Sequence, residues 1–290
     1  MLKFGLSIPR QGEDFDRVLD STDELELKYI DLRSIGDKNV VDLSDSEAQE
    51  IRNLVKKHGA KVCSISPFLF FRLPLTKGDD EVTIRGSYSE HLNMLNRALE
   101  LARVFDTNIV RCFSFETEFI FSHCGYKGLP FDIWGKIVER LQKAARIAEA
   151  AGVILALENC CWCNLGTGFL VAKAIDEIGS KNLRLWWDPA NSVMASGENP
   201  YPDEYEQVKD YIVSIDMRDE IIDRRYNYWS HVAMGQGNKL NWTDIFQALI
   251  RDNYQGVILL ESTYIPEGGT IFDGAKESFS KVRQMLASLK

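Results

Sequence analysis

The chain has 290 residues, of which 45% are hydrophobic and 27% are charged, and its formal net charge at pH 7 is -9. This acidic balance argues against a protein that binds nucleic acid, because phosphate-backbone contacts need clustered lysine and arginine. No apolar run approaches the roughly 20 residues of a membrane-spanning helix, so no membrane partner is expected. The segment MLKFGLSIPR turns polar too early for a secretory signal. The six cysteines fit reduced thiols better than a disulfide framework, so we expect a cytoplasmic protein.

Strand-like and helix-like segments alternate along the chain. Apolar runs bounded by turn residues predict strands at 3–8, 29–34, 61–66, 108–115, 153–159, 183–188, 211–217 and 256–262. Apolar residues at helical spacing predict helices at 44–59, 88–105, 133–152, 170–179, 242–253 and 275–290.

Eight strands that alternate with helices predict an all-parallel sheet. Right-handed crossovers allow either a closed barrel or an open doubly wound sheet. Eight units and strand-end carboxylates favour the barrel, so we predict an α/β fold, a single (β/α)8 TIM-barrel domain over residues 1–290. The longer loops, 67–84 and 116–132, are candidate lids over the site.

Three carboxylates stand at the ends of apolar strand-like runs. Glu158 follows VILAL, Asp188 follows LRLWW, and Glu261 follows GVILL. Each one alone is better explained as a helix cap or an arginine partner. Together they would meet at the C-terminal face of a barrel, where reactive residues gather. Because converging carboxylates repel unless a cation or a proton lies between them, we predict a divalent-metal site.

Several motifs, taken in their order along the chain, resemble those of the xylose isomerase-like TIM barrels. This family holds sugar and sugar-phosphate isomerases and epimerases and shares a superfamily with endonuclease IV. The resemblance runs from YIDLRSIGDKNVVDLSD through IVRCFSF, LALEN, WWDPANSV and MGQGNKLNW to ILLES. It implies that Glu158, Asp188, Asp216 and Glu261 bind one divalent metal. Asp216 lies in DMRD, where the family has the histidine of an H-x-K-D motif. An all-oxygen shell suits Mn2+ or Mg2+, with Co2+ and Zn2+ as alternatives. Aspartate at position 216, in place of the family's histidine, is also compatible with altered or lost activity.

Four carboxylates around one dication leave an excess of negative charge, so cations are expected nearby. The candidates, which also serve as possible contacts for an anionic substrate, are Arg111, Arg218, Arg224, Arg225 and Lys239. Arg111 lies inside a predicted strand, so a buried partner is expected for it.

Aldose–ketose isomerisation and 3-epimerisation both begin with the loss of a proton next to a carbonyl. A metal that chelates the carbonyl and hydroxyl oxygens acidifies that C–H and stabilises the enediolate. The resemblance implies that Glu158 and Glu261 act as the two bases. A metal-assisted hydride shift is the alternative route, and the sequence does not separate the two.

Several other residues near strand ends are candidate substrate contacts. Asn191 can hydrogen-bond a sugar hydroxyl or cap a turn, and His231 precedes Gly235-Gln236-Gly237 at a spacing found among the relatives. Glu116 and Trp162 can line the pocket. The cysteines at 160, 161 and 163 would suggest Zn2+, but their spacing fits no common zinc module.

We therefore predict a metal-dependent isomerase or epimerase of a sugar, sugar phosphate or related polyol. A dehydratase or related lyase on the same barrel would use the same proton abstraction. A non-catalytic carbohydrate-binding barrel is a further alternative, motivated by Asp216. An endonuclease IV-type nuclease is disfavoured, since its multi-zinc cluster is rich in histidine and the chain has four. Relatives often form dimers or tetramers, so a homodimer or homotetramer is compatible with the resemblance.

Overall fold

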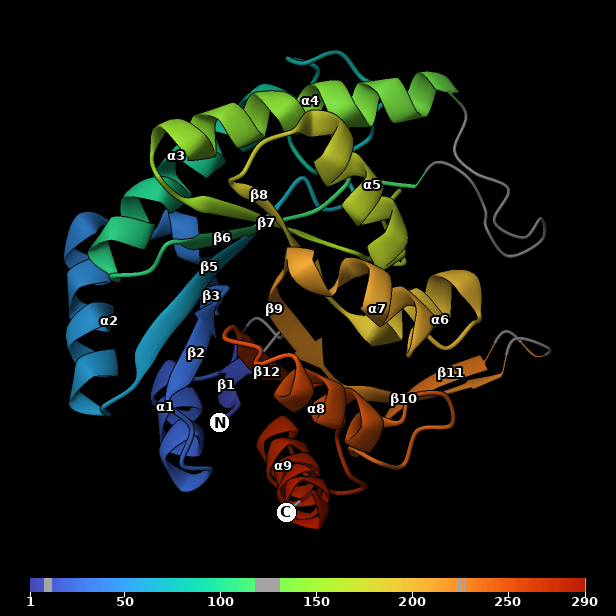
Figure 1. Ribbon diagram of the computed structural model, residues 1–290. Coiled ribbons are helices and arrows are strands. Elements are labelled where there is room, and N and C mark those ends of the chain that lie inside the picture. Colours follow the sequence, from blue (N-terminus) through green and yellow to red (C-terminus); the bar gives the residue numbers. More distant parts are fainter. Residues whose placement is uncertain (8–11, 118–130, 224–225, 227, 290) are drawn as a thin grey trace.

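The computed structural model describes residues 1–7, 12–117, 131–223, 226 and 228–289. Figure 1 shows strands at the centre of the molecule with helices around them. Eight strands close into a barrel of parallel pairs. In barrel order they are β1 (Lys3–Ser7), β2 (Tyr29–Leu32), β5 (Lys61–Leu69), β6 (Ile109–Cys112), β7 (Ile154–Glu158), β8 (Leu183–Trp187), β9 (Ile212–Met217) and β12 (Val257–Glu261). The predicted TIM barrel is confirmed, and its strands follow one another in chain order.

The helices of the described residues lie outside the strands (Figure 1). They are α1 (Phe15–Glu24), α2 (Asp45–Lys57), α3 (Tyr88–Val104), α4 (Phe131–Ala150), α5 (Gly168–Ile178), α6 (Pro189–Ser196), α7 (Asp203–Val208), α8 (Trp242–Arg251) and α9 (Ile271–Ser288). Short 3-10 turns occur at Val40–Asp42 and Lys209–Tyr211. Capping boxes at Ser44, Ser87 and Thr270 fix where α2, α3 and α9 begin, since each satisfies otherwise free backbone N–H groups.

Two short antiparallel strand pairs form separate small sheets outside the barrel sheet. They are β3 (Ser34–Ile35) with β4 (Lys38–Asn39), and β10 (Asp219–Asp223) with β11 (Tyr228–Val232). The β10–β11 hairpin follows β9 directly and projects beyond the barrel in Figure 1. Neither pair was predicted, nor were α1, α6 and α7. Of the two candidate lids, 116–132 lies largely outside the described residues.

The period of two along a strand explains how the barrel interior is layered. Ala156, Trp186 and Leu259 form a small apolar cluster inside the barrel. Two residues further along each chain segment come Glu158, Asp188 and Glu261. The same alternation therefore places an apolar layer below a layer of carboxylates at the C-terminal end of the barrel.

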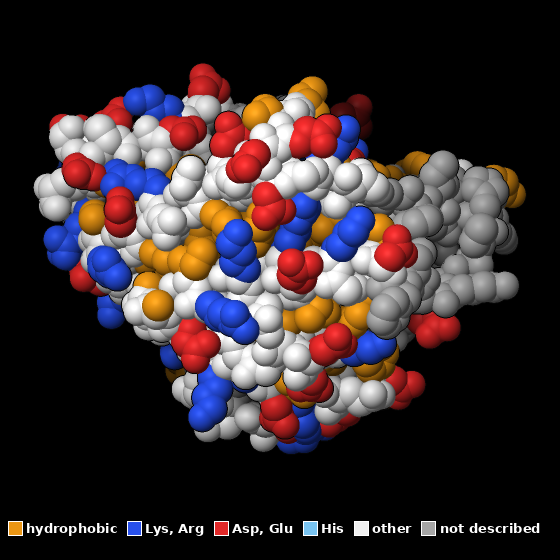
Figure 2. Space-filling view, turned by 90° about the horizontal axis from the view of Figure 1, so that it is seen from above, with side chains coloured by type: hydrophobic (Ala, Val, Ile, Leu, Met, Phe, Trp, Pro, Cys, Tyr) orange, Lys and Arg blue, Asp and Glu red, His pale blue; other side chains and the backbone are white. Residues whose placement is uncertain are grey.

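One face of the surface is seen in Figure 2, where acidic and basic side chains are interspersed. This face has no extended basic area of the kind that a nucleic-acid backbone requires. Among the described residues, no helix combines the length and the apolar character needed to cross a bilayer.

Candidate metal and active centre

Three buried carboxylates converge at the C-terminal ends of neighbouring strands. Glu158 ends β7, Asp188 follows β8, and Asp216 lies in β9. Each offers a ligand oxygen within 4.8 Å of the other two. Glu158 is 3% exposed, and Asp188 and Asp216 are fully buried. This placement brings together three of the four residues that the resemblance assigns to a metal.

Three arginines lie among these carboxylates, and two of them contact the fourth, Glu261 at the end of β12. Arg33 Nη2 lies 2.8 Å from Glu261 Oε1, and Arg218 Nε lies 3.1 Å from Glu261 Oε2. Arg218 Nη2 is also 2.8 Å from Asp188 Oδ2. Arg111 Nη2 contacts Glu158 Oε2 and lies 3.2 Å from Asp216 Oδ2. Arg111 thus has the buried partners that its place in a strand predicts.

The environment separates the pKa values of these carboxyl groups. Burial raises the pKa of Asp188 to about 6 and that of Asp216 to about 7, against the opposing effect of the arginines. Burial also raises the pKa of Glu158 well above its usual range, although Arg111 opposes this. Burial would raise the pKa of Glu261 as well, but Arg33, Arg218 and Arg111 together lower it to about 2. Carboxyl groups whose pKa values are pushed apart in this way are suited to separate acid and base roles.

The donor set fits a hard divalent cation. Asp216 Oδ1 is buried without a hydrogen-bond partner among the described residues. Glu158 Oε2 and Asp216 Oδ2 are also buried, and both lie against Arg111 Nη2. Carboxyl groups also outnumber guanidinium groups, because Arg33, Arg111 and Arg218 pair with six of them: Asp31, Glu158, Asp188, Asp216, Glu220 and Glu261. Oxygen ligands carrying excess negative charge are what Mg2+ and Mn2+ prefer.

Asp31 and Arg33 are residues of the centre that were not predicted from the sequence. Asp31 accepts hydrogen bonds from Ser64 Oγ at 2.6 Å, Ser66 Oγ at 2.5 Å and Arg33 Nε at 3.2 Å. Both residues are at least 94% buried. Their spacing could have identified them, because Asp31 and Arg33 are charged residues at alternate positions of the strand-like run YIDLRS. Alternate residues of a strand share a face, so this spacing places both on the same side.

Asn191 lies within the centre. Its Nδ2 donates to Asp188 Oδ2 at 2.7 Å and to Glu158 Oε1 at 3.1 Å. Its backbone N–H donates to Asp188 Oδ1 at 2.9 Å, so Asp188 also caps helix α6. Asp188, and not Asn191, is the cap residue, while Asn191 lies beside the carboxylates. A hydrogen bond from Asn191 to a sugar hydroxyl stays a prediction.

His231 and Trp162 lie at the mouth of the centre. A cavity of about 180 Å³ opens above Glu158 and Glu261, and both residues line it. His231 Nδ1 is 3.1 Å from Glu220 Oε1, and Arg218 Nη1 reaches the same oxygen at 2.5 Å. Trp162 is 47% exposed, so a flat face is available to a ligand at the rim.

The remaining residues that the sequence proposed for the site are not part of the carboxylate centre of the described residues. Glu116 is 3.3 Å from Arg72 and is not among the described residues that line the cavity. Lys239 is exposed, and Arg224 and Arg225 lie outside the described residues. The thiols at positions 160, 161 and 163 are free. In the part of the chain that the structure describes, the converging metal-ligand group consists of carboxylates and includes no cysteine.

Asp219 builds the turn beside the centre. Its Oδ2 accepts the backbone N–H groups of Gly235 at 2.9 Å and Gly237 at 3.0 Å. A Cβ on Gly237 would lie 1.8 Å from Asp219 Oδ1. The G-x-G motif is thus explained by close approach of the backbone to a buried carboxylate.

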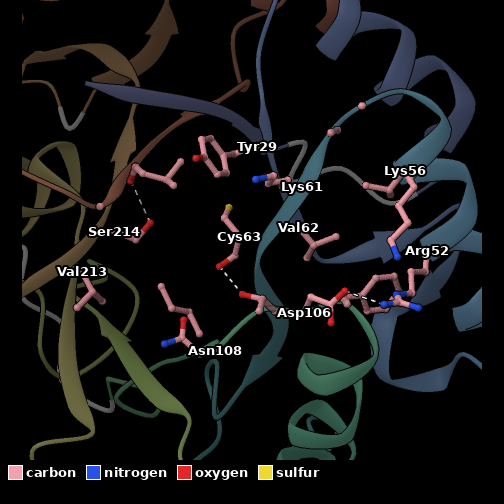
Figure 3. A pocket seen from close by; sticks show the side chains of 18 of the residues that line it. Tyr29, Arg52, Lys56, Lys61, Val62, Cys63, Asp106, Asn108, Val213 and Ser214 are labelled. Atoms are coloured by element: carbon pink, nitrogen blue, oxygen red, sulfur yellow. Dashed lines mark hydrogen bonds and ion pairs between the residues drawn. The ribbon is translucent and has the colours of Figure 1, made fainter. Parts of the chain in front are cut away.

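A larger cavity, of about 710 Å³, lies at the opposite end of the barrel. Tyr29, Cys63, Asn108 and Ser214 are among the residues that line it (Figure 3). No group of converging metal-ligand side chains occurs there among the described residues. Reactive residues of TIM barrels gather at the C-terminal face, so we assign the candidate site to the carboxylate centre despite its smaller cavity.

Comparison with known proteins agrees with this architecture. The family described as "Xylose isomerase-like TIM barrel" matches residues 19–285. The chain belongs to this family. No curated protein matches it by sequence.

Solved structures of the family cover nearly the whole chain. The probable 3-DHS dehydratase AsbF from Bacillus anthracis has a TM-score of 0.75 at 15% identity, over 97% of this chain and 99% of that one. An L-ribulose 3-epimerase has a TM-score of 0.72 at 18% identity, over 99% and 95%. A xylose isomerase-like TIM barrel protein from Mycobacterium smegmatis, crystallised in complex with magnesium, has a TM-score of 0.71 at 18% identity, over 99% and 97%. At these identities the likeness establishes the fold.

Proposed function

We propose that the protein is a divalent-metal-dependent isomerase or epimerase of a sugar, sugar phosphate or related polyol. The observation that carries the proposal is the convergence of Glu158, Asp188 and Asp216, whose buried ligand oxygens lie within 4.8 Å of one another. A relative crystallised with magnesium and a relative named as a sugar epimerase support it.

Glu158, Asp188 and Asp216 would hold the cation, with Glu261 as the fourth ligand implied by the family. When bound, a dication supplies Lewis-acid polarisation of a substrate carbonyl, which acidifies the neighbouring C–H. Mn2+ or Mg2+ is the expected ion because the donor atoms are all oxygens.

The protein's own groups would move the proton. The resemblance assigns proton abstraction to Glu261, which is ionised across the neutral range because arginines lower its pKa to about 2. The same arginines make it a weaker base than an ordinary carboxylate. The resemblance implies that Glu158, on the opposite side of the mouth, exchanges the proton on the other face of the same carbon. His231 and Trp162 line the cavity above these carboxylates and would orient a small polyhydroxy substrate there.

The test is turnover on a panel of ketoses and their phosphates with added Mn2+ or Mg2+. Glu261→Gln, which keeps the size of the side chain but removes the base, should lose roughly 100-fold or more in kcat. Glu206→Gln is a control, because Glu206 is a surface residue that pairs with Arg251 and Lys209. No turnover of any panel member by the metal-loaded protein would contradict the proposal.

A dehydratase is the second candidate, and the similarity to a probable 3-DHS dehydratase favours it. The same carboxylates would remove a proton beside a carbonyl, but a hydroxyl would then leave from the next carbon. Loss of water from 3-DHS without interconversion of any ketose would select this reaction.

A further inference from the structure

A fixed positive charge lies inside the carboxylate centre. Arg111 projects from β6 into the barrel, and its side chain is only 3% exposed. Its Nη2 contacts Glu158 Oε2 and lies 3.2 Å from Asp216 Oδ2. A guanidinium does not lose its proton under conditions that proteins tolerate. The charge of Arg111 is therefore present whatever the protonation of its neighbours.

Arg111 approaches the same oxygens that a metal would use. Glu158 and Asp216 belong to the converging ligand group. A hard dication binds carboxylate oxygens at about 2.0 to 2.6 Å. A cation held by Glu158 Oε2 and Asp216 Oδ2 would therefore lie beside Arg111 Nη2. Like charges at such short range repel strongly in a site that is poorly hydrated.

Arg111 is held by aromatic faces more than by hydrogen bonds. Its Cζ lies 4.6 Å from the ring centroid of Trp186 and 5.1 Å from that of Phe113. Its Nε and Nη1 are buried and have no hydrogen-bond partner among the described residues. Cation–π contacts fix orientation less strictly than paired hydrogen bonds do, so the guanidinium can shift along these rings.

The other two arginines of the centre are anchored differently. Arg33 donates from Nε to Asp31 at 3.2 Å and from Nη2 to Glu261 at 2.8 Å. Arg218 uses Nε, Nη1 and Nη2 in hydrogen bonds to side chains of the centre. Their hydrogen bonds go to carboxylate oxygens outside the Glu158–Asp216 pair, although Arg33 Nη2 also lies 3.7 Å from Asp216 Oδ2. Arg111 contacts both members of the pair, so it is the cation best placed to exchange with a metal.

We propose that Arg111 competes with the divalent cation for Glu158 and Asp216, and so sets how tightly the centre holds its metal. The proposal rests on the metal site of the proposed function and adds a determinant of its affinity. Arg111 offsets part of the negative charge of the two carboxylates and gives up part of that contact to a dication by shifting along Trp186 and Phe113. Metal binding to the natural protein is accordingly weak and exchangeable.

The experiment measures Mn2+ affinity, from the signal of free Mn2+ in electron paramagnetic resonance, on protein first stripped with a chelator. Arg111→Met removes the charge at similar side-chain length, and Arg111→Lys keeps it. Arg140→Met is the matched control, because Arg140 is a partly buried arginine that pairs with Asp79, outside the barrel. We expect the Kd of Arg111→Met to fall at least about tenfold, while Arg111→Lys and Arg140→Met stay within about threefold of the natural protein.

Circular dichroism checks that each variant is folded, and Arg111→Gln replaces Arg111→Met if that variant is not. Mn2+ binding by the neutral variant at the natural affinity, or more weakly, would overturn the competition but leave the metal site intact. If neither the natural protein nor the neutral variant binds Mn2+, Mg2+, Co2+ or Zn2+, the metal site itself fails, and the competition fails with it. The two failures are thus distinguished by whether the natural protein binds metal.

Discussion

The guanidinium of Arg218 donates two hydrogen bonds to one oxygen of Asp188, from Nε at 3.0 Å and from Nη2 at 2.8 Å. The same side chain donates from Nη1 to Glu220 in the β10–β11 hairpin at 2.5 Å. Arg218 therefore connects the end of β8 to the hairpin, and the two parts of the site share one buried cation.

Replacing Arg218 by Met should destabilise the fold strongly. The variant leaves Asp188 and Glu220 buried with an uncompensated charge, and loss of one partner of a buried pair costs about 3 to 5 kcal/mol. Denaturant unfolding at pH 8 measures this change in the free energy of unfolding. Arg17→Met is the control, because Arg17 and Glu24 form an exposed pair and its loss should cost less than about 1 kcal/mol. Equal losses in the two variants would contradict a structural role for Arg218.

Gly237 cannot become Ala without moving Asp219. An added Cβ would lie 1.8 Å from Asp219 Oδ1 and 2.8 Å from the carbonyl oxygen of Glu220. We expect Gly237→Ala to lower the free energy of unfolding by about 3 kcal/mol. Gly135→Ala, at an exposed position in the second turn of α4 with no atom within 4 Å of an added Cβ, should instead raise it by roughly 0.5 to 1 kcal/mol. Thermal unfolding of both variants measures these two changes in stability. A Gly237→Ala variant as stable as the natural protein would refute this account of the turn.

Metal affinity should depend on pH in the neutral range. The pKa of Asp188 is about 6 and that of Asp216 is about 7, both raised chiefly by burial. A raised pKa means that each group is still partly protonated where an ordinary carboxyl is ionised, so protons compete with the cation. Affinity should be highest above pH 7 and fall as the pH drops through 7 and then 6. Mn2+ titrations between pH 5.5 and 8.5 test this, and a constant Kd over that range would contradict it.

The barrel could be predicted because buried parallel strands read as nearly continuous apolar runs. The carboxylates of the site could be predicted for the same reason, since Glu158, Asp188 and Glu261 each interrupt such a run at its end. Helix α1 was not predicted, although its Phe15, Val18 and Leu19 are buried at helical spacing. The arginine pairing could not be predicted locally, because Arg33 and its partner Glu261 are 228 positions apart.

The β10–β11 hairpin shows a second reason why local sequence patterns do not reveal every buried residue of the site. Asp219 and Glu220 are nearly fully buried, yet in the run DMRDEIID the sequence singled out only Asp216 and Arg218. Their burial follows from partners far along the chain, namely the N–H groups at Gly235 and Gly237 and the side chain of His231. Such partners become visible only once the barrel brings them together.

The central claim is that Glu158 and Asp216 bind a divalent cation. The most direct test is the shift of melting temperature on adding millimolar Mn2+ to the natural protein, Glu158→Gln, Asp216→Asn and the control Glu204→Gln. Glu204 is a buried carboxyl that accepts hydrogen bonds from Trp187 and Ser192 and lies outside the converging group. The account predicts that Mn2+ raises the melting temperature of the natural protein and of Glu204→Gln, but not of the other two variants. An unchanged melting temperature of the natural protein with every divalent cation, or a full shift in Glu158→Gln, would contradict it.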